Sequence, residues 1–255
     1  MTQSPSRAVL RNEILLVLGV SLGQAAVSSI LSFIDLETRV KRLSQATIAL
    51  NPPAVPDRPW LDLANQLYRV VFLVVPALLA LHLLNRTLGN RGTRDVLGLN
   101  TQRWRFDLGT GAGLAAVIGI PGLGLYLAAR ALGLNANLAA ATLSPVWWSG
   151  PVLTLLAIAN AVLEEVVVVG YLMTRLREIG WATPMAVAAS ALLRGSYHLY
   201  QGFGGFVGNA VMGVIFALFF VRFKRIGPLI IAHSLLDIVA FVGYTILVKH
   251  HVSWL

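Results

Sequence analysis

Cysteine is absent from this sequence of 255 residues, which excludes disulfides, cysteine-ligated zinc, iron–sulfur clusters and thiol nucleophiles. Charged residues are also scarce. They make up 12% of the chain, whereas a soluble domain contains about 25%. Because 56% of the residues are hydrophobic and the mean hydropathy is +0.73, the composition disfavours a soluble enzyme, a disordered tail and a nucleic-acid-binding module. It predicts an all-α polytopic membrane protein.

Acidic residues are few relative to basic ones, 11 Asp and Glu against 20 Lys and Arg, and the formal charge is +9. In a membrane protein this excess is typical of basic loops on the cytoplasmic side. The distribution of Lys and Arg over the loops predicts a multi-pass protein of the plasma membrane, with a cytoplasmic N-terminus and an external C-terminus. We expect no nucleic acid among its partners. The composition looks bacterial. Arg7 and Arg11 precede an apolar run long enough to span, so we expect no cleavable signal peptide.

One membrane-spanning helix needs about 20 mostly apolar residues. The sequence predicts about seven such helices, with a range of six to eight because boundaries read from sequence are uncertain by a few residues. They lie at 12–34, 67–85, 109–132, 150–174, 182–201, 204–222 and 228–248. No internal repeat is visible, so we expect a single membrane-embedded unit. Residues 1–149 would supply N-terminal helices and basic loops, and residues 150–248 a C-terminal helix core.

Two further segments are too short or too polar to span. The stretch 136–146 is apolar but short, and it is expected to be a re-entrant or interfacial piece. Residues 41–50 lie in the long polar connection 35–66 and fit an amphipathic helix at the membrane surface.

Polar side chains are concentrated in the last four predicted spans. A charge at the bilayer centre costs about 2.5–3.5 kcal/mol on insertion scales, so each such residue requires a partner or a function. The set comprises Asn160, Glu164, Glu165, Arg194, Tyr197, His198, Asn209, His233 and Asp237. This clustering predicts a polar site inside the C-terminal helix bundle.

Glu164 and Glu165 are adjacent, so on an α-helix their side chains point about 100° apart and cannot serve one ligand position equally. One of them can face a reaction centre while the other meets a supporting partner. Asn160 lies four residues before Glu164 and shares its face. The alternative is a purely structural pair, with one carboxyl protonated and the other in a salt bridge.

Two pairs of residues repeat a spacing of four, which places both members on one helical face: Arg194 with His198, and His233 with Asp237. Groups one turn apart can converge on a metal ion or a water molecule. Histidines can bind zinc or polarise a water directly, and a glutamate in an apolar environment can act as a base. Either arrangement activates water for amide hydrolysis. His198 and His233 are the candidate metal ligands, and the residues leave open whether zinc or any other metal is bound.

At these residues the chain resembles the CPBP family of intramembrane metalloproteases, also called the CAAX-protease and bacteriocin-processing or Abi family. The family's motifs are Glu-Glu-x-x-x-Arg, Phe-x-x-x-His and His-x-x-x-Asn/Asp on successive membrane helices. Here they read Glu164-Glu165-Val-Val-Val-Val169, Arg194-Gly-Ser-Tyr-His198 and His233-Ser-Leu-Leu-Asp237. The resemblance covers roughly residues 150–245. Two positions depart from it: Val169 replaces the arginine of the first motif, and Arg194 replaces the phenylalanine of the second.

The resemblance implies an endopeptidase whose substrate is a membrane-associated peptide or protein, since prenylated CAAX proteins are the eukaryotic substrates of the family. By resemblance, Glu164 or Glu165, with Glu164 favoured, activates the water together with His198, and His233 and Asp237 complete the site. Arg194 is expected to replace the missing arginine by pairing with one of the glutamates. Asn160 is a supporting residue. The oligomeric state is left open.

Three other functions fit parts of the pattern. A proton- or cation-coupled transporter would use buried Glu, His and Asp but predicts inverted repeats, which are not visible. A bis-histidine haem protein would use His198 and His233 but leaves the glutamates unexplained. An inactive family member acting as a binding or immunity scaffold is suggested by Val169 alone. If the protein is a protease, we expect its cavity to be reached from the cytoplasmic side past a basic rim, made of Arg175, Arg177, Arg222, Lys224 and Arg225. The ordinary positive-inside bias is the alternative explanation of these charges.

Overall fold

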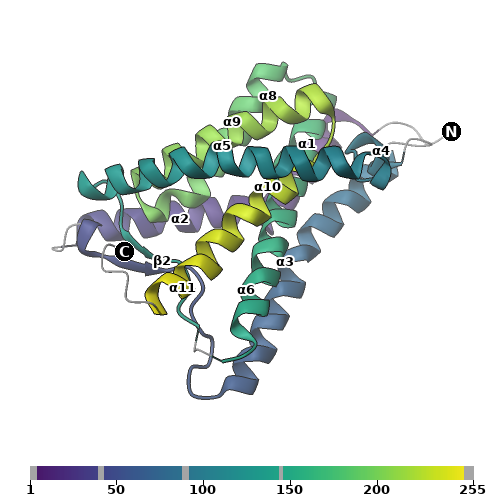
Figure 1. Ribbon diagram of the computed structural model, residues 1–255. Coiled ribbons are helices and arrows are strands. Elements are labelled where there is room, and N and C mark those ends of the chain that lie inside the picture. Colours follow the sequence, from purple (N-terminus) through teal and green to yellow (C-terminus); the bar gives the residue numbers. More distant parts are fainter. Residues whose placement is uncertain (1–4, 40–42, 88–91, 144–145, 250–255) are drawn as a thin grey trace.

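The computed structural model describes residues 5–39, 43–87, 92–143 and 146–249, and most of them are helical (Figure 1). The α-helices are α1 (Arg7–Gly19), α2 (Leu22–Thr38), α3 (Pro59–Thr87), α4 (Thr93–Val96), α5 (Trp104–Ala131), α6 (Ser149–Glu164), α7 (Leu172–Glu178), α8 (Thr183–His198), α9 (Phe203–Phe223), α10 (Gly227–Ile238) and α11 (Tyr244–Lys249). Two π-helical segments, η3 (Glu165–Tyr171) and η5 (Val239–Gly243), continue α6 and α10. Three short 3₁₀ turns are η1 (Leu43–Gln45), η2 (Thr101–Arg103) and η4 (Leu199–Gln201). The all-α polytopic membrane class is confirmed.

Five helical segments of the described chain are long and apolar enough to cross a membrane, and the bent pair α1–α2 would add a sixth. Six is the lower limit of the predicted range. The stretch 182–201 does not qualify, because α8 has 16 residues and is therefore about 24 Å long, less than the hydrocarbon core of about 30 Å. The first predicted span, 12–34, is broken after Gly19, where α1 and α2 are bent by 52°.

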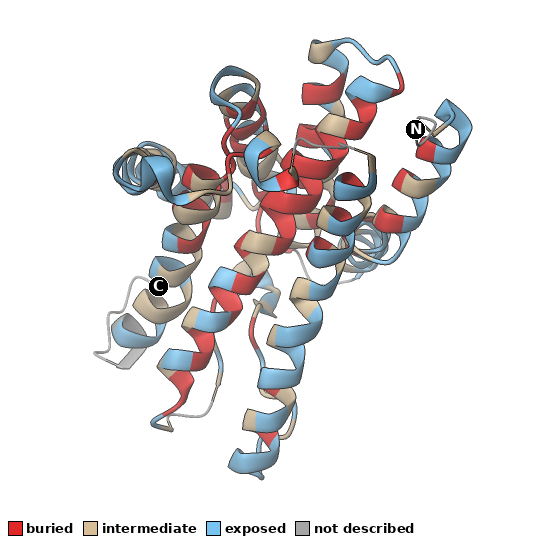
Figure 2. Ribbon diagram, turned by 90° about the vertical axis from the view of Figure 1, so that its right-hand side faces the viewer, coloured by how far each residue is buried: buried red, intermediate tan, exposed pale blue. Residues whose placement is uncertain are grey.

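The segment Ser149–Glu178, formed by α6, η3 and α7, is the central helix of the bundle. Its most apolar window is 72% buried, whereas the other four spans are between 6% and 33% buried. The helices α3, α8, α9 and α10 pack around it, and Figure 2 shows the buried residues gathered along this central column. A helix that is apolar on every side is expected in such a position. The glutamate pair therefore lies at the most enclosed part of the protein.

A small parallel sheet joins the connection 41–50 to the stretch 136–146. The strand β1 (Thr47–Ala49) pairs with β2 (Asn137–Ala139), with Ile48 opposite Leu138. The expected surface helix at 41–50 is therefore wrong for its described part, since residues 41 and 42 lie outside the described residues. The stretch 136–146 begins as a strand and is held to the first connection by Asn51, whose side-chain amide donates to the carbonyl of Ala140 at 3.0 Å.

The N-terminal helix is attached to the central column through Arg175, which is fully buried. Its guanidinium donates to Glu13 of α1 at 2.8 Å, to Glu178 at 2.7 Å and to Thr87 at the end of α3 at 2.7 Å. A charge-assisted network of this kind connects three helices at one point. Arg175 is therefore a structural residue and is unavailable to a substrate.

A second buried arginine, Arg225, connects the start of α5 to the turn between α9 and α10. It forms two 2.7 Å bonds to the carboxylate of Asp107 and two more to Asn100. Hydrogen bonding to Asp107 raises the pKa of the Arg225 guanidinium. Gly98, with φ of 62°, is required here because a Cβ would lie 2.5 Å from the Cγ of Arg225. With Arg175 and Arg225 both buried, the predicted basic rim is wrong in two of its five members.

We expect Asp107→Leu to lower the free energy of unfolding by about 3–5 kcal/mol, because it leaves the buried Arg225 without its carboxylate. The double variant Asp107→Leu/Arg225→Met should recover most of this loss. The matched control is Asp35→Leu, which breaks the exposed Asp35–Arg39 ion pair and should cost less than about 1 kcal/mol. Thermal unfolding in detergent measures all three. Equal melting temperatures for Asp107→Leu and Asp35→Leu would contradict this account of the Arg225 site.

Candidate active site

The two glutamates lie where the central helix changes from α to π. Glu164 is the last residue of α6, and Glu165 begins η3. A π-helical turn is wider than an α-helical one and occurs often at functional sites. Ser190 of α8 donates its hydroxyl to the carbonyl of Val168, inside this segment, at 3.1 Å. Both carboxylates turn toward α8 and reach the same guanidinium, which two adjacent residues of a regular α-helix were not expected to do.

Arg194 of α8 is fully buried and joins the two carboxylates. One of its nitrogens lies 3.2 Å from Glu164 and another 2.8 Å from Glu165. The predicted pairing of Arg194 with the glutamates is thus confirmed as a contact, but it bridges both acids instead of binding one of them bidentately. Val169, where the family motif has arginine, is fully buried in the apolar core. The positive charge of the site comes from α8 instead.

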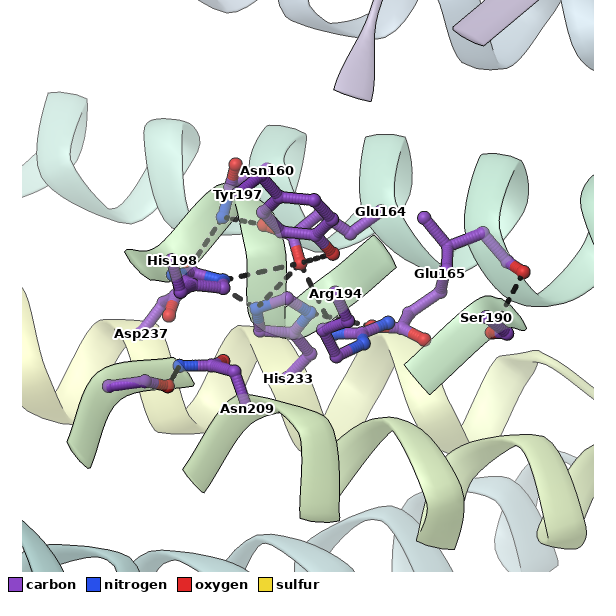
Figure 3. Close-up of polar contacts among 12 residues, drawn as sticks. Asn160, Glu164, Glu165, Ser190, Arg194, Tyr197, His198, Asn209, His233 and Asp237 are labelled. Atoms are coloured by element: carbon purple, nitrogen blue, oxygen red, sulfur yellow. Dashed lines mark hydrogen bonds and ion pairs between the residues drawn. The ribbon is translucent and has the colours of Figure 1, made fainter. Parts of the chain in front are cut away.

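Glu164 receives hydrogen bonds at both carboxylate oxygens. The Tyr197 hydroxyl donates to Oε2 at 2.6 Å, and the Asn160 amide donates to Oε1 at 3.1 Å. Asn160 also donates to Asp237 at 3.1 Å and so connects the two acids (Figure 3). Sequence reasoning gave Tyr197 no role. Its position three residues after Arg194, on the same helical face, was the available signal.

The two histidines approach Glu164 from different helices without contacting it directly. Nε2 of His198 lies 3.8 Å from Glu164 Oε2, and Nε2 of His233 lies 4.0 Å from the same oxygen. His233 Nε2 is also 3.7 Å from Asp237 Oδ2. These separations are too long for hydrogen bonds, and a water molecule can bridge polar groups at such distances. These ring and carboxylate atoms thus lie at separations that one bridging water can connect.

The other ring nitrogen of each histidine is held by a neighbour. Nδ1 of His233 lies 2.7 Å from Glu165 Oε1, and Nδ1 of His198 lies 3.1 Å from the amide nitrogen of Gln201. Because that amide nitrogen can only donate, a neutral His198 carries its proton on Nε2. This nitrogen is buried and forms no hydrogen bond within the described residues. It therefore points an unused N–H donor toward the carboxylate of Glu164.

A cavity of about 390 Å³ adjoins this group. Glu164, His198, Asp237 and Asn160 all line it, whereas Glu165 and His233 lie behind its wall. The expected convergence on one polar cavity is thus met for Glu164 and His198, with His233 one layer deeper. The predicted basic rim does not line this cavity. Its wall is otherwise mainly apolar, formed by Val20, Leu22, Ala25, Leu50, Phe72, Leu73, Pro76, Leu156, Leu163 and Phe241.

Among the described residues, one group has the composition and spacing to hold a metal ion: Glu164, Glu165 and His233, whose ligand atoms lie within 4.8 Å of one another. This group contains His233 of the predicted ligand pair and does not include His198. The carboxylates of this group are already bonded to Arg194, so a cation has to compete with the guanidinium. Asn209, also in the predicted polar set, bonds instead to the backbone of Gly205.

The buried Glu–His–Asp group lies among helices long and apolar enough to cross a membrane. Residues 146–239 match the family model described as type II CAAX prenyl endopeptidase Rce1-like. The match runs from just before α6 to the start of η5 and includes every residue of the site. Neither the search of curated proteins nor that of solved structures found a match. This match supports the CAAX-protease family that the motifs indicated.

Proposed function

We propose that the protein is an intramembrane endopeptidase that hydrolyses a peptide bond of a membrane-associated substrate, with Glu164 as the base that activates water. The observation that carries the proposal is the gap between Glu164 Oε2 and the Nε2 atoms of His198 and His233, at 3.8 and 4.0 Å. A water in this gap can donate to the carboxylate and accept from His198. The site faces a largely apolar cavity, which suits a lipid-modified peptide.

The proposed reaction assigns a role to each group around this water. Glu164 takes a proton as the water oxygen attacks the carbonyl carbon of the substrate, and the Nε2–H of His198 stabilises the developing oxyanion. Glu164 then returns the proton to the leaving amine as the tetrahedral intermediate breaks down. Arg194 and Tyr197 keep Glu164 ionised and oriented before the attack. Glu165 and His233 support this arrangement from behind.

This assignment also bears on the alternative of an inactive scaffold, for which Val169 was the sole support in the sequence. The pairing of Arg194 with both glutamates supplies the charge that Val169 lacks. It favours an active enzyme over a scaffold. No contact of the described site favours a transporter or a haem protein.

The experiment compares purified wild-type protein with His198→Gln in detergent micelles, using a farnesylated peptide and mass spectrometry of the products. We expect wild-type protein to release two fragments and His198→Gln to do so about 10²–10⁴-fold more slowly, the usual loss for a positioned acid–base group. The matched control is His82→Gln, since His82 is an exposed histidine on α3 away from the cavity. Loss of cleavage in both variants, or in neither, would count against the proposal.

Metal removal tests a separate part of the proposal. A metal held by Glu164, Glu165 and His233 would supply Lewis-acid activation of the water. Because Arg194 already neutralises both carboxylates, we expect protein treated with a chelator and shown by elemental analysis to be metal-free to keep its cleavage rate. Loss of the rate, with recovery on adding zinc, would instead identify a metalloprotease.

A further inference from the structure

Gln201 of η4 contacts the ring of His198 through its amide nitrogen, which lies 3.1 Å from Nδ1. The same nitrogen donates to the Tyr200 hydroxyl at 3.1 Å, so its two hydrogens have one acceptor each. All three residues line the cavity beside Glu164. The contact between Gln201 and His198 therefore lies in the wall of the reaction cavity.

The turn η4, which carries Gln201, is held on one side by α2. The hydroxyl of Ser29, a buried residue of α2, accepts from the backbone N–H of Tyr200 at 2.7 Å. Ser29 precedes the matched residues 146–239. The N-terminal half of the chain thus takes part in fixing a turn that belongs to the site.

On its other side, η4 is held by the connection between α5 and β2. The backbone N–H of Ala136 donates to the carbonyl of Gln201 at 3.0 Å, and the N–H of Phe203 donates to the carbonyl of Leu134 at 3.0 Å. Gly202 has φ of 116°, and a Cβ there would lie 2.5 Å from the carbonyl oxygen of Leu134, so this close approach requires glycine. With both sides bonded, the amide of Gln201 is presented to the histidine ring from a rigid support.

The position of the proton on His198 determines what this ring presents to Glu164. A neutral imidazole carries one proton, on either of its two nitrogens. Because the amide N–H of Gln201 occupies the lone pair of Nδ1, the proton is on Nε2, which lies 3.8 Å from Glu164 Oε2 (Figure 3). With the proton on Nδ1 instead, Nε2 would direct a lone pair toward the carboxylate, and the site would lose its N–H donor for the oxyanion.

We propose that Gln201 is a positioning residue of the hydrolytic reaction: by donating to Nδ1 it keeps the proton of His198 on Nε2, where the reaction needs a donor. This inference rests on the proposed function. The partner of one ring nitrogen determines which tautomer a histidine adopts. Gln201 acts through His198 and takes no part in the bond-breaking step.

Two substitutions separate this role from simple packing against the ring. Gln201→Glu keeps the shape of the side chain, but its carboxylate only accepts hydrogen bonds and draws the proton to Nδ1. Gln201→Met has a similar length and donates no hydrogen bond, so both tautomers become accessible. A packing role predicts that Glu is tolerated better than Met, whereas a donor role predicts the reverse. The matched controls are Gln102→Glu and Gln102→Met, because Gln102 is exposed in η2 and does not line the cavity.

The first arm of the test locates the proton by NMR of the full chain in detergent micelles, with ¹⁵N-labelled histidine. The chain has five histidines, and the signals of His198 are those missing from His198→Gln. At a pH where the ring is neutral, we expect the proton on Nε2 in wild-type protein and both Gln102 variants. It should lie on Nδ1 in Gln201→Glu and be shared between the nitrogens in Gln201→Met. A proton on Nδ1 in wild-type protein, or one confined to Nε2 in every folded Gln201 variant, would overturn the proposal.

The second arm measures cleavage of the farnesylated peptide by the same preparations. We expect kcat to fall by about 10²–10³-fold in Gln201→Glu, the usual loss for one oxyanion donor, and by less in Gln201→Met. KM should change little, since the donor acts mainly in the transition state. Faster cleavage by Gln201→Glu than by Gln201→Met would show that Gln201 only packs against the ring and would overturn the proposal. If the proton moves as expected but wild-type protein cleaves no peptide, the proposed function fails while the control of the His198 tautomer by Gln201 stands.

Discussion

Arg194→Met is expected to lower the free energy of unfolding by about 3–5 kcal/mol, the usual cost of removing one partner from a buried ion pair. Arg194 is fully buried and is the cation that contacts both Glu164 and Glu165 within the described residues. Without it, two adjacent carboxylates are left in an apolar environment, and at least one must take up a proton to relieve their repulsion. Cleavage should be lost together with stability, because a protonated Glu164 cannot accept a proton from water.

Thermal unfolding and cleavage by the same preparations measure this effect. Arg194→Lys keeps the charge but not the planar fork that reaches both acids, so it should fall between wild-type protein and Arg194→Met. Arg222→Met is the matched control, because Arg222 is an exposed arginine that stacks on Phe223 with 5.2 Å between its guanidinium carbon and the ring centre. Melting of Arg194→Met at the temperature of this control would mean that the glutamates do not depend on Arg194.

The fold class and the composition of the site could be predicted from the sequence, because both depend on local patterns of apolar and charged residues. Long apolar stretches identified three helices. The predicted 67–85 lies within α3, and the predicted 109–132 and 204–222 agree with α5 and α9 to within a few residues. Charged residues within apolar segments are costly, so their positions in 150–248 indicated a site. The contact between Arg194 and the glutamates followed from the same argument.

The irregular elements could not be predicted, since hydropathy does not distinguish an α-helix from a π-helix. The π-helical segment Glu165–Tyr171 is as apolar as a regular helix, so its winding leaves no signal in the hydropathy. The strands β1 and β2 were missed, and α8 was predicted at 182–201 as a full span although it has 16 residues. A run of apolar residues does not specify its own length or partner. These elements depend on contacts between distant segments.

Apart from the pairing of Arg194 with the glutamates, the ion pairs between helices could not be predicted from the sequence. Glu13 and Arg175 are 162 positions apart, and Asp107 and Arg225 are 118 apart. Counting Lys and Arg in the loops assigned both arginines to a basic rim. The sequence also gave no indication of a role for Asp62, whose carboxylate accepts a hydrogen bond from the backbone N–H of Ala54 at 2.7 Å. Sequence shows that such residues are charged but not which partner lies across the bundle.

Glu164→Gln should lower kcat for cleavage of the farnesylated peptide by about 10²–10⁴-fold, because the amide cannot accept the proton of the attacking water. The substitution is nearly isosteric and can still accept from Tyr197 and Arg194 through its carbonyl oxygen. The protein should therefore remain folded. The corresponding control is Glu37→Gln, since Glu37 is an exposed acid near the end of α2.

The account rests on Glu164 as the base in hydrolysis, and the cleavage rate of Glu164→Gln at saturating peptide tests it most directly. Wild-type protein, Glu164→Gln and Glu37→Gln are purified in the same detergent, and equal melting temperatures establish that they are equally folded. The account predicts cleavage by wild-type protein and Glu37→Gln, and a kcat reduced by about 10²–10⁴-fold in Glu164→Gln. Folded Glu164→Gln protein that cleaves at the wild-type rate would contradict it.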